Sequence, residues 1–217
     1  AFVPSRRSLM GNSCFEGGAA RVPPLPRGGE AETGAFAAEA EMEERAPIET
    51  SPFDESLYRY TLYGNSLRAV AVTSPRASVD SVAVCVLVEA GSFLEPAAVP
   101  GLAHFLEHMV FMGSERYAQE NGFEEFLSTH GGGSNATTCS ETTEYHFECS
   151  RSGLKGALMR LCDAVFSPLL RLSSMEGEID AIESEYVIAC GSDSARLEQV
   201  ACALMCDPEH PASRFTW

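Results

Sequence analysis

The sequence lacks long apolar runs and is poor in positive charge. Its longest uninterrupted apolar segment, residues 82–88, is far shorter than the roughly 20 residues that a membrane-spanning helix needs, so we expect no membrane span. Lysine and arginine together number 15 against 31 aspartates and glutamates, a net charge of −16. Such acidity argues against nucleic acid as a partner and suits basic peptides or simple solubility.

The sequence also lacks the closely spaced cysteine pairs that form zinc knuckles. The 8 cysteines are scattered along the chain, and none has the spacing of a zinc knuckle. Cys85, Cys149 and Cys162 fall at apolar positions of expected strands and a helix, which predicts that they are buried. A reducing, intracellular setting is the simplest interpretation of this cysteine usage, with the cytoplasm as the first expectation.

The first quarter of the chain shows no pattern of a packed core. Residues 1–29 contain four arginines and a single acid, whereas residues 30–55 are strongly acidic. We expect disorder over residues 1–56 and a folded domain over residues 57–217. The arginine-rich start resembles an organellar transit segment, which keeps mitochondrion or plastid as alternatives, although an arbitrary low-complexity tail is the favoured interpretation.

The most informative segment is HFLEH, residues 104–108, inside an otherwise apolar stretch. In a helix over residues 102–112, His104 and His108 lie one turn apart on the same face. Glu107 then lies about 100° or less from both. Burying such groups costs several kcal/mol unless each has a partner. A zinc ion would give both imidazoles a partner, and a water molecule on the zinc would give the carboxylate one. The alternative is two core histidines that bind no metal.

A catalytic zinc site needs a third protein ligand, and an expected helix over residues 174–189 offers candidates. Its apolar residues recur at helical spacing and predict a stripe made of Met175, Ile179, Ile182 and Tyr186. Glu178 and Glu185 lie two turns apart on one edge of that stripe, so they are the acids best placed to face inward. An acidic border on an amphipathic helix is the alternative.

Three segments occur in the order and spacing of a known family: GLAHFLEHMVFMGS, ENGFEEFLSTHGGGSNATTCSETTEYHFE and EIDAIESEY. From about residue 58 to residue 217 the chain resembles the inverzincin peptidases of the pitrilysin and insulysin family, and within it the nardilysin type. The resemblance implies one Zn²⁺ per chain with His104, His108 and Glu185 as metal ligands. It implies that Glu107 is the general base, and that Glu178 supports a ligand or its helix.

A second region carries the expected substrate contacts. Residues 143–149 alternate between apolar and polar side chains, as in a half-buried strand, and residues 134–138 predict a second strand. The resemblance implies that this second strand is a sheet edge to which the peptide adds as a further strand. Asn135, Ala136 and Thr137 are therefore the candidate substrate-binding residues. An ordinary hairpin with a protected edge is the alternative.

The expected fold class is α+β, with an antiparallel-rich mixed sheet packed with helices. Strands are expected at residues 58–62, 67–73 and 79–88 besides the two above, and further helices at residues 153–166 and 194–206. The resemblance implies the metallohydrolase domain of the pitrilysin/insulysin and mitochondrial processing peptidase type. The expected function is that of a zinc metalloendopeptidase acting on peptides, basic ones included. The alternatives are an organellar presequence-processing subunit and a non-catalytic partner or scaffold of the same fold.

Peptidases of that family are several times longer than this chain. We therefore expect an N-terminal catalytic domain that is incomplete at its C-terminus and has the remaining domains of the peptidase as partners. On its own the chain should bind zinc but hydrolyse little or no peptide.

Overall fold

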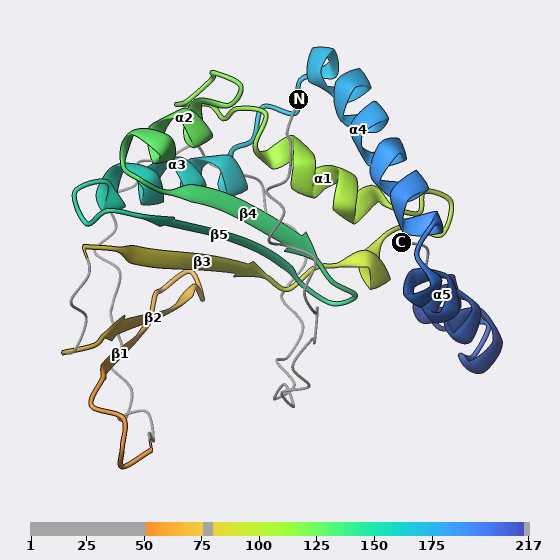
Figure 1. The fold of residues 1–217 in the computed structure, drawn as a ribbon, viewed down its shortest axis with the longest axis horizontal. Coiled ribbons are helices and arrows are strands. Elements are labelled where there is room, and N and C mark those ends of the chain that lie inside the picture. Colours follow the sequence, from red (N-terminus) through yellow and green to blue (C-terminus); the bar gives the residue numbers. More distant parts are fainter. Residues whose placement is uncertain (1–50, 76–79, 215–217) are drawn as a thin grey trace. The chain divides into compact units, whose positions relative to one another are not determined.

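A computed structural model describes residues 51–75 and 80–214 (Figure 1). These residues belong to two compact units, Ala1–Val72 and Thr73–Trp217, which are treated separately below. The disorder expected for residues 1–56 lies outside the described residues, apart from residues 51–56. Among the described residues, no helix is both long and apolar enough to cross a membrane.

The first unit contains a β-hairpin. Strands β1 (Leu57–Leu62) and β2 (Arg68–Thr73) form a two-stranded sheet around a turn at Gly64-Asn65. The turn is closed by a hydrogen bond from the Tyr63 amide to the Leu67 carbonyl, 2.9 Å. The predicted hairpin is thus confirmed, with its strand bounds shifted by one residue.

A three-stranded antiparallel sheet organises the second unit. Its strands are β3 (Val82–Val88), β4 (Gly133–Thr138) and β5 (Thr143–Cys149), in the order β3-β5-β4. Ala136 of β4 and Val86 of β3 both pair with Tyr145 of the central strand. Among the described residues β4 is therefore an edge strand with one side unpaired.

Helices α1 (Leu102–Val110), α2 (Gly122–Thr129) and α3 (Leu154–Phe166) cover one face of this sheet (Figure 1). The alternation predicted for β5 is confirmed, since Tyr145, Phe147 and Cys149 are buried beneath these helices. Leu127 and Leu161 complete the core from α2 and α3. Burial of this apolar layer is the main force that fixes α1 on the sheet.

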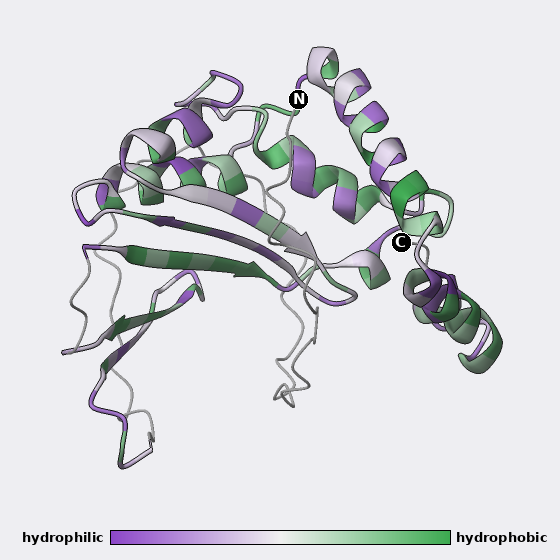
Figure 2. Cartoon of the chain, in the orientation of Figure 1, coloured by the Kyte–Doolittle hydropathy of each residue, from purple (hydrophilic) through white to green (hydrophobic). Residues whose placement is uncertain are grey.

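The uniformly apolar strand β3 is less buried than its sequence predicts. Its side chains alternate between half-buried and exposed, and Cys85 and Leu87 lie on the exposed face. Figure 2 shows β3 as almost entirely hydrophobic even so. The expectation that Cys85 is buried was wrong, because the helices of this unit cover only the opposite face of the sheet. Cys149 is buried as expected, and Cys162 is half-buried.

Helix α4 (Leu172–Cys190) crosses near α1 and leads into α5 (Asp193–Met205), with short 3-10 turns at Ser92–Leu94 (η1) and Pro211–Arg214 (η2). The predicted apolar stripe of α4 is partly wrong, because Ile179 is 55% exposed and Tyr186 is also exposed. The side chains turned inward include Glu178, Glu185 and the buried Ala189. Figure 2 accordingly shows hydrophilic and hydrophobic residues mixed along α4.

These elements confirm the predicted α+β class. The strands are antiparallel, and α1, α2 and α3 lie on one face of the sheet rather than alternating with parallel strands.

Candidate metal centre

The first turn of α1 is fixed by residues before it. Gly101, which precedes the helix, has a positive φ of 85° and provides no capping side chain. The carboxylate of Glu95 instead accepts hydrogen bonds from the amides of Gly101 and Ala103, both 3.0 Å long. The last turn of α1 is held by the buried Met109 and Val110. The histidine face of the helix is thereby turned away from the sheet core.

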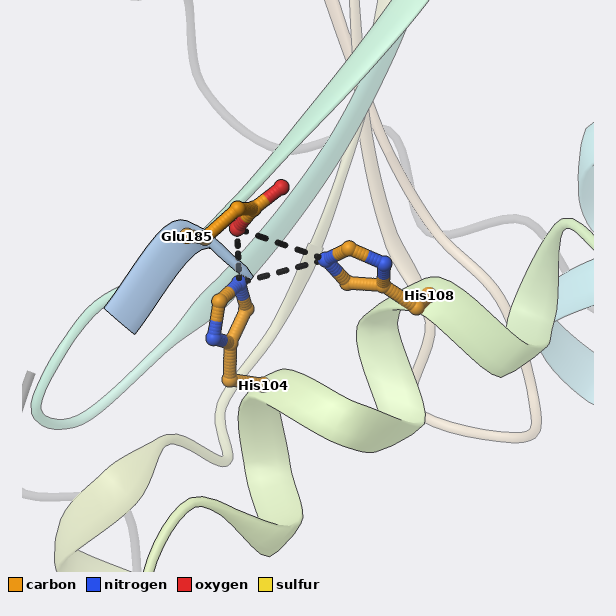
Figure 3. A group of neighbouring side chains, drawn as sticks. All are labelled: His104, His108 and Glu185. Atoms are coloured by element: carbon orange, nitrogen blue, oxygen red, sulfur yellow. Dashed lines mark hydrogen bonds and ion pairs between the residues drawn. The ribbon is translucent and has the colours of Figure 1, made fainter. Parts of the chain in front are cut away.

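His104, His108 and Glu185 converge on one point (Figure 3). The two Nε2 atoms of His104 and His108 are 3.3 Å apart. Oε2 of Glu185 lies 3.5 Å from the first and 3.8 Å from the second. All three ligand atoms lie within 4.8 Å of one another, so the structure brings the three predicted ligands together.

This donor set suits a zinc ion. Atoms each bonded at about 2.0–2.1 Å to a tetrahedral Zn²⁺ lie roughly 3.4 Å from one another. The three observed separations, 3.3, 3.5 and 3.8 Å, are close to that value. Two imidazoles and one carboxylate are also a donor set found in catalytic zinc sites, in which a fourth position stays open.

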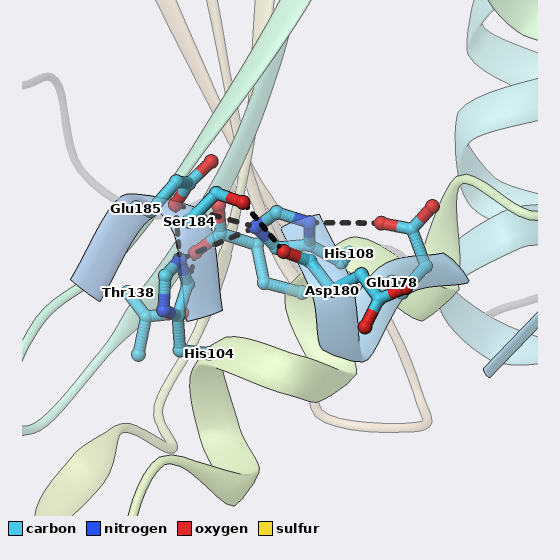
Figure 4. A network of polar contacts seen from close by, with 8 residues as sticks. His104, His108, Thr138, Glu178, Asp180, Ser184 and Glu185 are labelled. Carbon is cyan, nitrogen blue, oxygen red and sulfur yellow. Dashed lines mark hydrogen bonds and ion pairs between the residues drawn. The ribbon is translucent and has the colours of Figure 1, made fainter. Parts of the chain in front are cut away.

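Glu178 contacts the ring nitrogen of His108 that points away from His104. Its Oε2 lies 3.0 Å from Nδ1 of His108, and the two side chains are equally buried. Figure 4 shows His108 between Glu178 on one side and Glu185 on the other. An Nδ1–H that donates to a carboxylate leaves Nε2 with a free lone pair, the state needed for a metal ligand.

Glu107 lies beside the cluster in a sheltered position. It is 8% exposed, and its Oε2 accepts a hydrogen bond of 2.5 Å from Oγ1 of Thr138 on β4. Thr138 was not among the residues predicted from the sequence. Strand alternation could have indicated it, because residue 138 lies two positions after Ala136 and hence on the same face of β4.

Burial lowers the pKa of His104, an effect that the Glu107 carboxylate partly opposes and the His108 imidazole reinforces. Burial also raises the pKa of Tyr145 to about 12, with Glu107 contributing. Both pKa shifts indicate that the site is shielded from water and that the Glu107 carboxylate acts on its neighbours as a negative charge.

The three candidate substrate residues do not all face the same way. Ala136 packs on the helix side of β4, against the core. Asn135 and Thr137 pair with His146 and Glu144 of β5 and so lie on the opposite face. Only Ala136 of the three is therefore directed to the side of the sheet that carries α1 and the histidines.

Comparison with known proteins gives a consistent result. A family model described as insulinase (peptidase family M16) matches residues 70–208. A nardilysin-like protein of Arabidopsis thaliana is 46% identical over 135 residues, which are 62% of this chain and 13% of the relative. Insulin-degrading enzyme of Mus musculus is 38% identical over 168 residues, 77% of this chain and 16% of the relative.

The crystal structure of pitrilysin is similar in fold as well as in sequence. It superposes with a TM-score of 0.76 at 36% identity, and the match covers 82% of this chain and 19% of pitrilysin. The chain thus spans less than a fifth of the length of these relatives. The resemblance inferred from the sequence motifs is confirmed: the chain belongs to the insulinase family of peptidases.

Proposed function

We propose that this chain carries the catalytic metal centre of a zinc metalloendopeptidase. The main support is the convergence of three side chains from two separate helices. The ligand atoms of His104, His108 and Glu185 all lie within 4.8 Å of one another. In this proposal these three residues hold one Zn²⁺ and Glu178 orients His108. A bound zinc ion would polarise the scissile carbonyl and lower the pKa of a water molecule toward about 7.

Glu107 is the general base of the proposed reaction. Its carboxylate accepts the proton of the attacking water and then returns it to the amine that leaves. The burial of Glu107 and its hydrogen bond to Thr138 favour this role, because a base must be held in one orientation. The hydroxyl of Thr138 also gives the buried carboxylate a hydrogen-bond donor while no substrate is present.

Strand β4 is the proposed binding site for the peptide. It is an edge strand among the described residues, and it contacts α1. An extended peptide that adds to this edge is aligned by backbone hydrogen bonds. Ala136 would lie nearest the metal, with Asn135 and Thr137 on the outer face of the same strand. We propose peptides as substrates, and the net charge of −16 favours basic ones.

The complete activity is proposed to need the remaining domains of the peptidase. Relatives are several times longer than this chain, and a single edge strand cannot enclose a peptide. The chain alone should therefore bind zinc but hydrolyse little peptide. Fast, chelator-sensitive hydrolysis by the purified chain would contradict this part of the proposal.

We also propose an intracellular setting. Cys85 and Cys190 are exposed thiols. Thiols in this state persist in a reducing compartment.

The role of Glu107 is tested by Glu107→Gln. The substitution keeps the size of the side chain but removes the basic carboxylate. Zinc content and peptide hydrolysis are measured for parent and variant in the complete peptidase, because the chain alone should hydrolyse little peptide. The proposal predicts unchanged zinc and lost hydrolysis. A zinc-loaded Gln variant that cleaves as fast as the parent would refute the general-base role.

A further inference from the structure

The loop that precedes α1 is hydrogen-bonded to the end of the edge strand. We call residues 91–95 the bracket loop. The amide of Ser92 donates to the carbonyl of Cys139 at 3.0 Å, and the amide of Phe93 donates to the carbonyl of Ser140 at 2.8 Å. Cys139 and Ser140 directly follow β4. The beginning of the bracket loop is therefore attached to the strand proposed to bind the peptide.

This attachment requires glycine at residue 91. A Cβ atom placed there would lie 2.2 Å from the Cys139 carbonyl oxygen and 2.7 Å from the Thr142 amide nitrogen. Both neighbours are backbone atoms, so no side-chain movement can relieve the clash. Any larger residue would have to push the loop away from the β4–β5 turn.

The end of the bracket loop is attached to α1. One carboxylate oxygen of Glu95 accepts from the Gly101 amide and the other from the Ala103 amide. The first amides of a helix have no partner inside the helix, and a carboxylate there satisfies them and interacts favourably with the helix dipole. Glu95 thus supplies the cap that Gly101 cannot provide.

His104 belongs to the turn that Glu95 caps, because it is the next residue after Ala103. His108 lies one turn further on, in the part of α1 that is held by the buried Met109 and Val110. Without the cap, the first turn would unwind for part of the time, and His104 would leave its place beside His108. A ligand that needs the ordered turn then binds more weakly, in proportion to the fraction of molecules in which the turn is formed.

We propose that Glu95 is a positioning residue of the metal centre, and that the bracket loop sets the spacing between the peptide strand β4 and His104. This inference rests on the proposed zinc site. It assigns to Glu95 no contact with the metal or the substrate. Its effect acts through the order of residues 102–104.

The test compares Glu95→Ala, Glu95→Gln and the control Asp54→Ala in the purified chain. Asp54 is also a carboxylate that accepts a backbone hydrogen bond, from Ser56, but it lies in the other compact unit. Zinc affinity is measured by competition with a chelating dye. Amide hydrogen exchange of residues 102–106 is measured without metal.

Glu95→Ala should raise the Kd for zinc about fivefold to tenfold, as expected for the loss of a helix cap. It should speed exchange at residues 102–106 while the amides of β5 stay protected. Glu95→Gln, which keeps one acceptor oxygen, should have a smaller effect. Asp54→Ala should leave both properties as in the parent. Weaker zinc binding is also expected for Gly91→Ala, which displaces the loop without removing a charge.

Equal zinc affinity in Glu95→Ala and the parent would overturn the inference. So would faster exchange throughout the unit, since Glu95 would then support the fold in general. A parent chain that binds no zinc is a different result, because it refutes the proposed metal centre itself. If the parent binds no zinc, amide exchange still tests the helix cap. Equal exchange at residues 102–106 in Glu95→Ala and the parent would then show that Glu95 does not stabilise the first turn of α1.

Discussion

Helices α1 and α4 both contribute residues to the proposed metal centre, but they differ in how they are held in place. α1 joins the core on the sheet through Val110, also buries Met109, and is capped by Glu95. In α4, which has 19 residues, Ala189 is the buried residue among those described. The side chain of Glu185, its proposed ligand, is 42% exposed.

This contrast divides the site into two parts: the histidines of the well-anchored α1, and Glu185 of the more exposed α4. The two imidazoles belong to a helix anchored by buried residues, whereas Glu185 reaches them from a helix in which only Ala189 is buried among the described residues and whose Glu178 contacts His108. A metal ion would link the two helices, so part of its binding free energy would dock α4 on α1. The predictions below test this division.

The largest effect is expected from the buried side chain of Met109 in α1. Met109→Ala removes a side chain that is 1% exposed and should lower the free energy of unfolding by about 2–5 kcal/mol. Ile179→Ala, on the exposed face of α4, should change it by about 0.5 kcal/mol or less. Urea denaturation followed by circular dichroism measures both. Similar losses in the two variants would mean that α4 is part of the same core.

Metal removal should affect the two helices unequally. A chelator should speed amide exchange in α4 (Leu172–Cys190) markedly, because its link to α1 is lost, and should affect Val110 and the amides of β5 little. Exchange measured by mass spectrometry with and without zinc gives the comparison. If α4 and β5 respond equally, the metal does not act as the link between helices.

A smaller effect is expected from the carboxylate behind His108. Glu178→Ala should weaken zinc binding roughly 10-fold to 100-fold, the usual result of removing a carboxylate that orients a ligating histidine. Glu183→Ala is the matched control, because Glu183 is an exposed acid of the same helix. Equal zinc affinity in these two variants would show that Glu178 acts only through its charge or not at all.

The last effect is on stability rather than on zinc binding, and it concerns the link from β4 to Glu107. Thr138→Val keeps the shape of the side chain but leaves the buried carboxylate without its donor, which should cost about 1–3 kcal/mol of stability. Thr138→Ser should restore most of the loss. Thermal unfolding of both variants measures it. Equal stability of the Val and Ser variants would show that the hydroxyl contributes nothing to holding Glu107.

The sequence predicted best those features that depend on local periodicity. The alternation of β5 and the one-turn spacing of His104 and His108 follow from strand and helix geometry alone, and the structure has both. The inward face of α4 was not predictable in this way. Its orientation is set by α1, so Ile179 is exposed while Glu178 reaches His108.

Two further features depend on contacts between distant segments. Cys85 is exposed because the helices cover only one face of the sheet, although its strand is apolar throughout. The bond between Thr138 and Glu107 requires the register of β4 against β5 and the placement of α1 over it. Neither the layer arrangement nor the register is encoded in the pattern of a single segment.

Zinc content per chain, determined on the purified 217-residue protein with Glu185→Ala alongside, tests the metal centre most directly. The account predicts about one zinc per parent chain and a clear loss in the variant, whose fold is unchanged because Glu185 lies on the partly exposed α4. A parent chain without zinc, or a variant that retains it fully, would contradict the assignment of His104, His108 and Glu185 as the ligands.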